Sequence, residues 1–259
     1  MCLVAVAWRV HPRWPLALIA NRDEAHARPS AAAGFDPQAP AVYGGRDLVQ
    51  GGGWLQVSRE GRLAAVTNVR GPSQQPAPAS RGWLVRDFVR GADDAIAFTA
   101  ALAARAGDVG RFNLLVHDGD ALVCASNHPG YASAPVAPGL HAMSNGPFDA
   151  PWPKAVFATR VLAAWLQSPL AETALPDAAT IEPLFTALRD TTPAPDELLP
   201  DTGVGIELER MLSPPFVLDP AYGTRCSSVV LAGSAGLLFA ERRYAADGRA
   251  ESDSLAWLR

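Results

Sequence analysis

The sequence is poor in cysteine and has no surplus of positive charge. Its three cysteines in 259 residues, Cys2, Cys124 and Cys226, are too few and too scattered for a disulfide scaffold or a CxxC zinc site. The formal net charge of −4 argues against a general nucleic-acid-binding surface. Because the thiols have no disulfide framework, we expect them to be reduced and the protein to be cytoplasmic.

Long apolar runs are also absent. No window approaches roughly 18 consecutive apolar residues, so no transmembrane helix is expected. No charged segment precedes the apolar start of the chain, and no long apolar stretch ends in a cleavage site, which argues against a secretory signal. With 49% hydrophobic and 19% charged residues, the composition is globular. Since no internal repeat or linker divides the chain, we expect one domain over residues 1–259.

The most informative stretch is residues 1–24. Two apolar runs, Leu3–Val10 and Leu16–Ala20, flank a segment with two prolines, and short apolar runs bounded by turn signals predict buried strands. If the strands pair as a hairpin, the register places Cys2 opposite Asp23. A slip of one residue would turn every side chain to the other face, so this count predicts proximity and not contact.

Cys2 becomes the first residue when the initiator methionine is removed, which a small second residue permits. Its own α-amine, with an ordinary pKa near ~8, could then take the thiol proton, and the thiolate is the nucleophilic form. The alternative is a structural cysteine, because cysteine is among the most buried residue types. The polar cluster Asn21–Glu24, at the far end of the predicted hairpin, favours the nucleophile.

Strand and helix signals alternate along the rest of the chain. Strands are predicted at 54–57, 63–69, 112–116, 121–125, 140–143, 225–231 and 237–243, and helices at 81–89, after 93–94, from 153 to about 167 and around 181–188. Residues 25–43 are predicted as a long surface loop and 190–215 as irregular. Because hairpins dominate and the first is apolar on both faces, we predict an α+β fold: an αββα sandwich of two stacked antiparallel sheets with outer helices.

Short motifs occur in order along almost the whole chain and resemble those of the NRDE family, also called the transport and Golgi organisation protein 2 family. These motifs are Met1–Val4, Ile19–Glu24, Gly52–Leu55, Thr67–Arg70, Ser80–Gly82, Phe112–Leu115, Met143–Gly146, Pro151–Lys154 and Tyr222–Arg225. Two positions depart from the family pattern, in which Thr or Ser is usual in place of Gly53 and Ser in place of Cys226.

The NRDE family in turn resembles N-terminal nucleophile hydrolases, especially the choloylglycine and penicillin V acylase group. This resemblance implies the same αββα sandwich and a first cysteine that attacks an amide. The positions that fit the catalytic residues of that group are Cys2, Arg22, Asp23 (or Glu24), Asn68, Asn145 and Arg225. Our candidate substrate-binding residues are Asn21, Glu24, Trp54 and Arg70.

Amide cleavage needs a nucleophile, a base and donors for the developing oxyanion. Asn68 and Asn145 carry uncharged NH₂ donors, while Arg22 and Arg225 would lower the pKa of the thiol or bind a substrate carboxylate. Two structural alternatives stand beside these roles. Residues 22–24 could form a buried ion-pair knot, and Asn145 could serve only as a turn residue.

The predicted function is an N-terminal-cysteine amidohydrolase that acts on a non-peptide C–N amide bond of a small molecule, with no metal or other cofactor. The alternative is a non-catalytic carrier of an apolar ligand such as haem, a lipid or acyl-CoA, since the wider family has been linked to haem mobilisation and lipid metabolism. The histidines are isolated and more typical of surface or turn positions than of axial ligands. They are His11, His26, His117, His128 and His141. A pure interaction module would leave the strand-end polar cluster unexplained.

Overall fold

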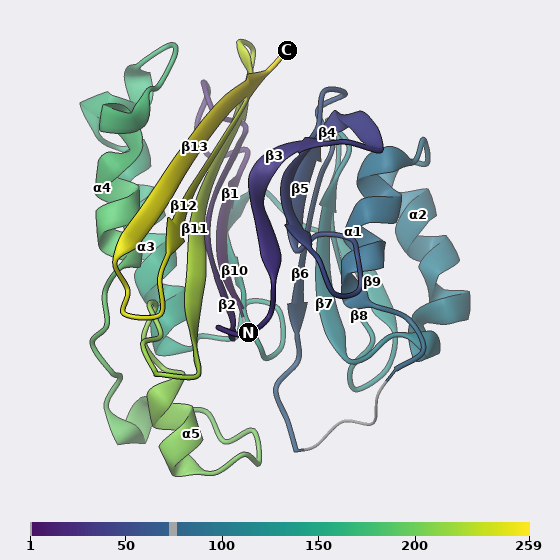
Figure 1. Ribbon diagram of the computed structural model, residues 1–259. Coiled ribbons are helices and arrows are strands. Elements are labelled where there is room, and N and C mark those ends of the chain that lie inside the picture. The colour runs from purple at the N-terminus through teal and green to yellow at the C-terminus, as the bar shows by residue number, and fades with distance from the viewer. Residues whose placement is uncertain (1, 73–76) are drawn as a thin grey trace.

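The computed structural model describes residues 2–72 and 77–259 and consists of two stacked antiparallel sheets between layers of helices (Figure 1). Strand order is β10-β1-β2-β11-β12-β13 in one sheet and β3-β4-β5-β6-β7-β8-β9 in the other. Helices α3 and α4 pack on the outer face of the six-stranded sheet, and α1 and α2 pack on the seven-stranded sheet. The predicted αββα sandwich is confirmed.

The elements have the following bounds. The six-stranded sheet comprises β1 (Cys2–Trp8), β2 (Leu16–Ala25), β10 (Gly139–Met143), β11 (Tyr222–Gly233), β12 (Gly236–Tyr244) and β13 (Ala250–Leu258). The seven-stranded sheet comprises β3 (Ser30–Asp36), β4 (Ala39–Asp47), β5 (Leu55–Ser58), β6 (Leu63–Asn68), β7 (Phe112–His117), β8 (Leu122–Ser126) and β9 (Ala132–Pro135). The helices are α1 (Arg81–Arg90), α2 (Ala95–Leu102), α3 (Pro153–Leu166), α4 (Ala178–Leu188) and α5 (Ile206–Met211), with short 3₁₀ turns at 103–108, 169–172 and 196–198. None of the helices in these described ranges is both long and apolar enough to cross a bilayer.

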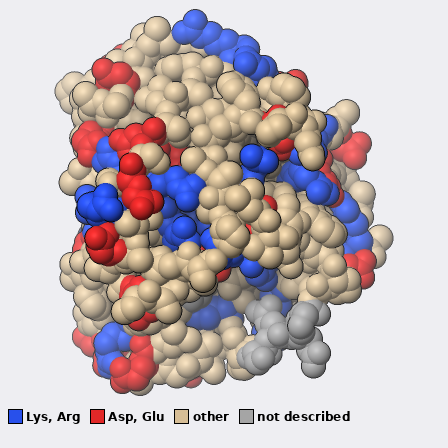
Figure 2. Space-filling model, in the orientation of Figure 1, with Lys and Arg blue, Asp and Glu red and all other residues tan. Residues whose placement is uncertain are grey.

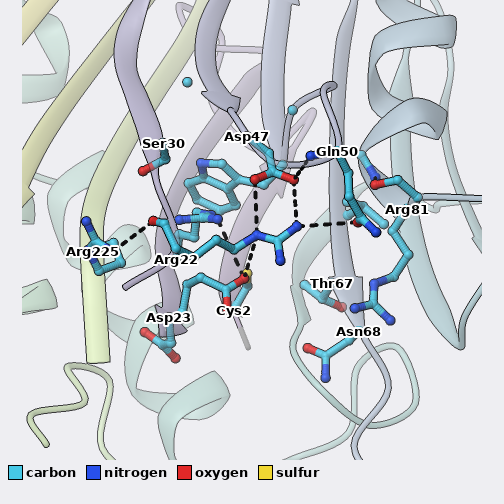
Figure 3. A pocket seen from close by; sticks show the side chains of 18 of the residues that line it. Cys2, Arg22, Asp23, Ser30, Asp47, Gln50, Thr67, Asn68, Arg81 and Arg225 are labelled. Atoms are coloured by element: carbon cyan, nitrogen blue, oxygen red, sulfur yellow. Dashed lines mark hydrogen bonds and ion pairs between the residues drawn. The ribbon is translucent and has the colours of Figure 1, made fainter. Parts of the chain in front are cut away.

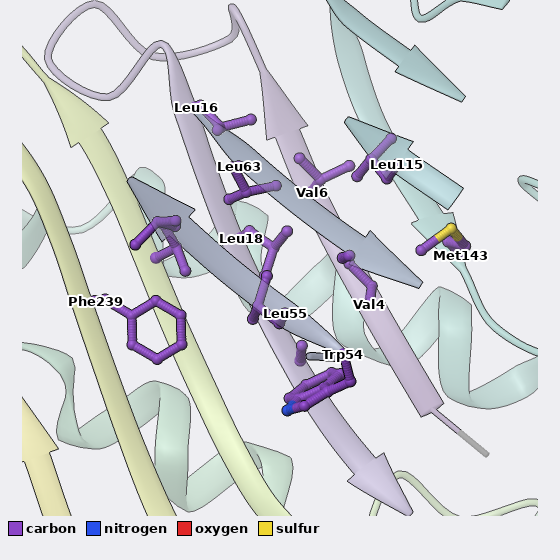
Figure 4. Close-up of a cluster of buried hydrophobic side chains, with 14 of the residues drawn as sticks. Val4, Val6, Leu16, Leu18, Trp54, Leu55, Leu63, Leu115, Met143 and Phe239 are labelled. Carbon is purple, nitrogen blue, oxygen red and sulfur yellow. The ribbon is translucent and has the colours of Figure 1, made fainter. Parts of the chain in front are cut away.

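Strand β1 is buried on both faces because it lies between two cores. Val4 and Val6 point inward and pack with Leu18 and Leu55 between the sheets (Figure 4). Leu3, with its alternate neighbours along the strand, points outward beneath α3 and α4. This double burial explains why the strand reads as an unbroken apolar run and not as an alternating pattern.

Local signals located the main helices correctly. Ser80 caps α1, its side chain accepting a hydrogen bond from the Gly82 backbone N–H at 3.2 Å. Pro153 occupies the first turn of α3, where a missing N–H costs nothing. Ser80 and Arg81, at the start of α1, both line the candidate site described below.

The predicted register of the first hairpin is wrong by one residue. Cys2 pairs with Arg22, and Trp8 pairs with Leu16. The turn closes with the backbone N–H of Arg9 donating to the carbonyl of Pro15 at 2.7 Å, and Arg9 adopts a positive φ of 52°. Because paired residues share a face, Cys2 and Arg22 both point between the sheets, and Asp23 points to the outer face.

Two segments predicted to be irregular contain regular structure. Residues 25–43 hold β3 and most of β4, and 190–215 hold α5. Strand β3 is an edge strand whose ladder with β4 is interrupted twice, so its sequence shows no clean period of two. Two further edge strands, β9 and β13, are largely exposed and lack a continuous apolar run, which explains why the apolar pattern did not predict them.

Candidate active site

A cavity of about 630 Å³ opens between the sheets at the end where β1 begins and β6 ends. Its wall includes eight of the ten predicted residues; Asn21 and Asn145 lie outside it. The eight are Cys2, Arg22, Asp23, Glu24, Trp54, Asn68, Arg70 and Arg225. Several of these converge from strands of both sheets (Figure 3). Basic side chains occupy the hollow near the centre of the face shown in Figure 2.

Cys2 is the first residue of β1, and it lines the cavity although it is almost completely buried. Burial raises the pKa of its thiol above the ordinary value of 9.0, and the negative charge of Asp23 raises that pKa further. Arg22 acts in the predicted direction and lowers it, but burial outweighs this effect. A proton acceptor is therefore needed for thiolate formation, because the neighbouring arginine is not sufficient.

Arg22 belongs to a network of ion pairs that crosses the cavity. Its Nη2 lies 3.6 Å from Glu24 Oε2, and Glu24 also lies 3.8 Å from Arg28 Nε. Arg28 in turn donates two hydrogen bonds to Asp47, at 3.0 and 2.7 Å. Arg22 and Glu24 thus take part in the ion-pair knot considered as an alternative role for residues 22–24, and the four residues of the network line the cavity.

Asp23 lies beside a buried lysine that the sequence reasoning did not assign to the site. Asp23 Oδ1 accepts a hydrogen bond from Thr224 Oγ1 at 2.7 Å, and burial raises the pKa of the carboxyl. The charge of Lys154 opposes that rise. Lys154 is itself buried, donates to the Leu212 carbonyl at 3.1 Å, and has its pKa lowered to about 8 by burial. A lysine on the buried side of the first turn of α3, one residue before Ala155, is the signal that could have identified it.

The two predicted asparagines have different positions. Asn145 is fully buried and does not line the cavity; its Nδ2 donates to the carbonyl oxygen of Asn68 at 3.0 Å and to Asn68 Oδ1 at 2.9 Å. With Oδ1 engaged in this way, the NH₂ group of Asn68 has no protein acceptor among residues 2–72 and 77–259. The geometry therefore assigns a supporting position to Asn145 and a cavity-facing donor to Asn68.

The loop that carries Asn145 also ties the two sheets together next to Cys2. Ser144 Oγ donates to the Cys2 carbonyl at 3.0 Å, and the Asn145 carbonyl accepts from the Arg70 backbone N–H at 2.7 Å. Asn113 Nδ2 donates to the Gly146 carbonyl at 2.7 Å. The loop is therefore hydrogen-bonded to both sheets, to Cys2 on one side and to Arg70 and Asn113 on the other.

The side chain of Asn21, which was predicted to bind substrate, lies outside the cavity. It points to the outer face of β2, where Nδ2 donates to the carbonyls of Leu188 and Pro215, both at 2.9 Å. Ser227 Oγ donates to Asn21 Oδ1 at 2.6 Å, so each amide atom has a structural partner. Strand alternation is the reason: with Arg22 facing the cavity, Asn21 must face the helices.

Arg225 reaches the cavity because of a β-bulge. Thr224 pairs with Asp23 and Cys226 pairs with Arg22, which leaves Arg225 as an extra residue on β11. Its Nη1 donates to the carbonyls of Ala25 and His26, among others, at 3.1 and 2.9 Å. No sequence signal reveals such a bulge, and its effect is to add a second inward-facing side chain next to Cys226.

The remaining wall residues include three arginines that were not predicted. Arg46 on β4, Arg81 at the start of α1, and Arg243, which pairs with Cys226 across β11 and β12, all line the cavity. Arg70 lines it too, but its guanidinium forms a buried ion pair with Glu209 and lies 5.0 Å from the centre of the Trp152 ring. Within the described ranges, no group of His, Cys, Asp and Glu side chains has the arrangement of a metal site.

Comparison with known proteins gives the family. The chain belongs to the transport and Golgi organisation 2 family, whose model matches residues 1–246. A transport and Golgi organization protein 2 homolog from Bos taurus is 30% identical over 262 residues, covering 93% of this chain and 92% of that protein. The Homo sapiens homolog is 29% identical with the same coverage.

Solved structures share the fold at low sequence identity. The C2A variant of conjugated bile acid hydrolase from Clostridium perfringens has a TM-score of 0.55 and 7% identity, covering 100% of this chain and 92% of the other. An N-acylethanolamine-hydrolyzing acid amidase ortholog from Caenorhabditis elegans has a TM-score of 0.51 and 10% identity, covering 89% and 92%. These similarities show that the chain shares its fold with these two hydrolases.

Proposed function

We propose that the protein is an N-terminal-cysteine amidohydrolase that cleaves a non-peptide C–N amide bond of a small molecule. The observation that carries this proposal is that Cys2 lies in the wall of a cavity that also presents the NH₂ group of Asn68. A cavity of about 630 Å³ has the size of a small-molecule site. The similar folds named as an amidase and a bile acid hydrolase support the same reaction class.

The reaction begins with a chain whose first residue is Cys2. Because burial raises the pKa of the thiol, it needs a base, and the α-amine of Cys2 accepts its proton. The sulfur then attacks the amide carbonyl carbon. Asn68 Nδ2 donates a hydrogen bond to the developing oxyanion. When the tetrahedral intermediate collapses, the C–N bond breaks and the amine leaves with the proton held by the α-ammonium group. Water then hydrolyses the thioester, releasing the acid and restoring the thiol.

The remaining residues hold this geometry in place. Asn145 orients Asn68 through two hydrogen bonds, and the ion pair of Arg22 with Glu24 holds the guanidinium next to Cys2. Asp23, beside Lys154, sits on the outer face of the strand that carries Arg22. We assign these groups to positioning, and Arg225 and Trp54 to the walls that contact substrate.

The test is the formation of a covalent acyl-enzyme. Intact mass first shows that the sample begins at Cys2, and the protein is then incubated with a panel of N-acyl amino acids and N-acyl anilides. We expect an acyl adduct on Cys2 and release of amine in the wild type and in Cys124→Ser, with both lost in Cys2→Ala. Release of amine that persists in Cys2→Ala would refute the proposal.

The carrier alternative and the cytoplasmic location stay predictions. Titration with haem and with long-chain acyl-CoA addresses the carrier. Saturable binding that persists in Cys2→Ala, without release of any amine in the panel above, would favour it.

A further inference from the structure

The cavity wall carries more positive than negative groups. Among the described residues that line it are seven arginines and four acidic residues, and the carboxylate of one of these, Asp23, points to the outer face of β2. The arginines are Arg22, Arg28, Arg46, Arg70, Arg81, Arg225 and Arg243, and the acidic residues are Asp23, Glu24, Asp47 and Glu241. A concave wall with a low-dielectric surround concentrates the field of such an excess, so it attracts an anion more strongly than the same charges on a flat surface.

Only part of this positive charge is neutralised within the protein. Arg22, Arg28 and Arg70 have carboxylate partners. Over residues 2–72 and 77–259, the other four arginines of the wall form no ion pair. The excess is therefore carried by specific guanidinium groups and does not result from the whole-chain charge, which is −4.

Two of these arginines use one nitrogen each for backbone contacts. Arg225 donates to carbonyls of the 25–28 segment through Nη1 alone, and Arg243 donates to the Ser30 carbonyl at 3.1 Å, also through Nη1. A guanidinium has five N–H donors in a fork that fits a carboxylate or a phosphate. The backbone contacts thus hold both groups in place and leave the rest of each fork for a ligand.

The register of the six-stranded sheet places these groups relative to the nucleophile. Cys2 pairs with Arg22, Arg22 with Cys226, and Cys226 with Arg243, so this row shares the inner face of four adjacent strands. With a strand spacing of about 4.8 Å, the backbone of Arg243 lies roughly 14 Å from that of Cys2. The bulge puts Arg225 on the same face, one residue from Cys226.

We infer that the substrate is an anion whose carboxylate or phosphate group binds Arg225 and Arg243, while its amide lies between Cys2 and Asn68. This inference rests on the proposed function and adds the class of its substrate. The span between the two subsites suits a molecule that carries its charge several bonds from the scissile amide. Arg81, on the first turn of α1, and Arg46, on β4, supply further positive charge to the wall.

A purely structural role for the arginines makes a different prediction. If Arg225 and Arg243 only anchor the segment 25–30, removing the charge of Arg243 would change stability without changing the selectivity of the cavity. Selectivity for charge must therefore be measured at Cys2 itself, by a reaction that does not require turnover.

The probes are iodoacetate and iodoacetamide, which alkylate a thiol by the same reaction and differ in charge. Their rates at Cys2 are measured by peptide mass spectrometry at low ionic strength, with N-acetylcysteine as the free-thiol reference. We expect the ratio of iodoacetate to iodoacetamide rates to be about tenfold higher at Cys2 than in the reference, and to fall towards it in added salt. A ratio equal to that of N-acetylcysteine would overturn the inference.

Three variants separate charge from structure. Arg243→Gln should lower the ratio at least threefold, Arg243→Lys should retain it, and Arg59→Gln, which alters an arginine beside the opposite end of the sandwich, should leave it unchanged. Equal ratios in Arg243→Gln and Arg243→Lys would overturn the assignment of Arg243.

Protection experiments identify the kind of anion. Glutarate and inorganic phosphate are each tested for slowing the alkylation of Cys2 by iodoacetamide. Protection by glutarate supports a carboxylate and protection by phosphate a phosphate, while protection by neither overturns the anion subsite. Because alkylation needs no hydrolysis, charge selectivity without amine release would reject the hydrolase and retain the subsite. Amine release without charge selectivity would reject the anion subsite and retain the hydrolase.

Discussion

Strand β1 runs from Cys2, in the wall of the charged cavity, to Trp8, in the wall of a smaller cavity of about 330 Å³. The same strands thus build both ends of the sandwich. At the second end, Trp8, Leu16 and Leu237 form apolar walls, and His117 is the buried titratable group that faces them. The ring centres of His117 and Trp8 lie 5.1 Å apart in an edge-on arrangement, and burial lowers the pKa of His117.

The difference between the two ends concerns how buried charge is accommodated. At the second end, burial lowers the pKa of His117, which favours the neutral ring, and the surrounding walls are apolar. At the Cys2 end, charged groups remain and are stabilised by partners in the protein, such as Glu24 for Arg22. We therefore expect substitutions at the second end to affect folding, and substitutions at the Cys2 end to affect chemistry.

Trp8→Ala should have the largest effect and should act on stability alone. Removing a buried indole ring leaves a void, and such truncations cost about 4 kcal/mol of unfolding free energy. Denaturant titration measures this cost. The rate at which iodoacetamide alkylates Cys2 in the folded variant should stay within about twofold of the wild type. A larger change in that rate would show that the two ends are coupled.

Substitutions of Asn68 and Asn145 should separate effects on activity from effects on stability at the Cys2 end. Asn68→Ala removes the proposed oxyanion donor, so kcat for amide release should fall about 100-fold with little change in the melting temperature. Asn145→Ala should also slow the reaction, because Asn68 loses its orientation. It should in addition lower the unfolding free energy by about 2 kcal/mol, since buried polar groups lose their partner. Equal stability of the two variants would contradict the supporting role of Asn145.

Lys154→Met should have the smallest effect, visible as a change in pH dependence. The pKa of Lys154 is about 8 in the folded protein against an ordinary value of 10.5. Between these values the unfolded chain binds a proton that the folded protein does not, so Lys154 makes stability rise with pH. From about pH 8 to pH 9, wild type should gain about 1 kcal/mol relative to the variant.

Measuring this difference at each pH removes contributions common to both proteins. The raised pKa values of Cys2 and Cys226 act in the opposite direction, because these groups bind protons more tightly when folded. A difference that is constant from neutral to alkaline pH would show that Lys154 is not held at a lowered pKa.

Local sequence patterns were sufficient to predict the layers of the fold. The apolar runs of β1 and β2, the Ser80 cap and Pro153 each act within a few residues, so their consequences can be read directly. Edge strands such as β13 are specified by pairing with one neighbour, and their polar sequence carries little signal of it.

The sequence was sufficient to predict most residues of the site, but not the direction in which their side chains point. Resemblance identified Cys2, Arg22 and Asn68, which the structure brings into one cavity. Which residue faces the cavity depends on the register of the hairpin and therefore on the geometry of its turn, where Arg9 has a positive φ that the apolar pattern does not predict. The partnership of Lys154 with Asp23 depends on α3 packing over β2, which no local pattern reports.

The bulge at Arg225 shows how a sheet can gain a side chain at one point by insertion instead of substitution. On its two sides, β11 keeps regular pairing with β2, from Tyr222 to Thr224 and again from Cys226 onward. An added residue there changes the phase of the strand at that point and leaves the apolar alternation beyond it intact. For the evolution of such a fold, the rim of the sheet can therefore vary in length and chemistry while the core retains its sequence constraints.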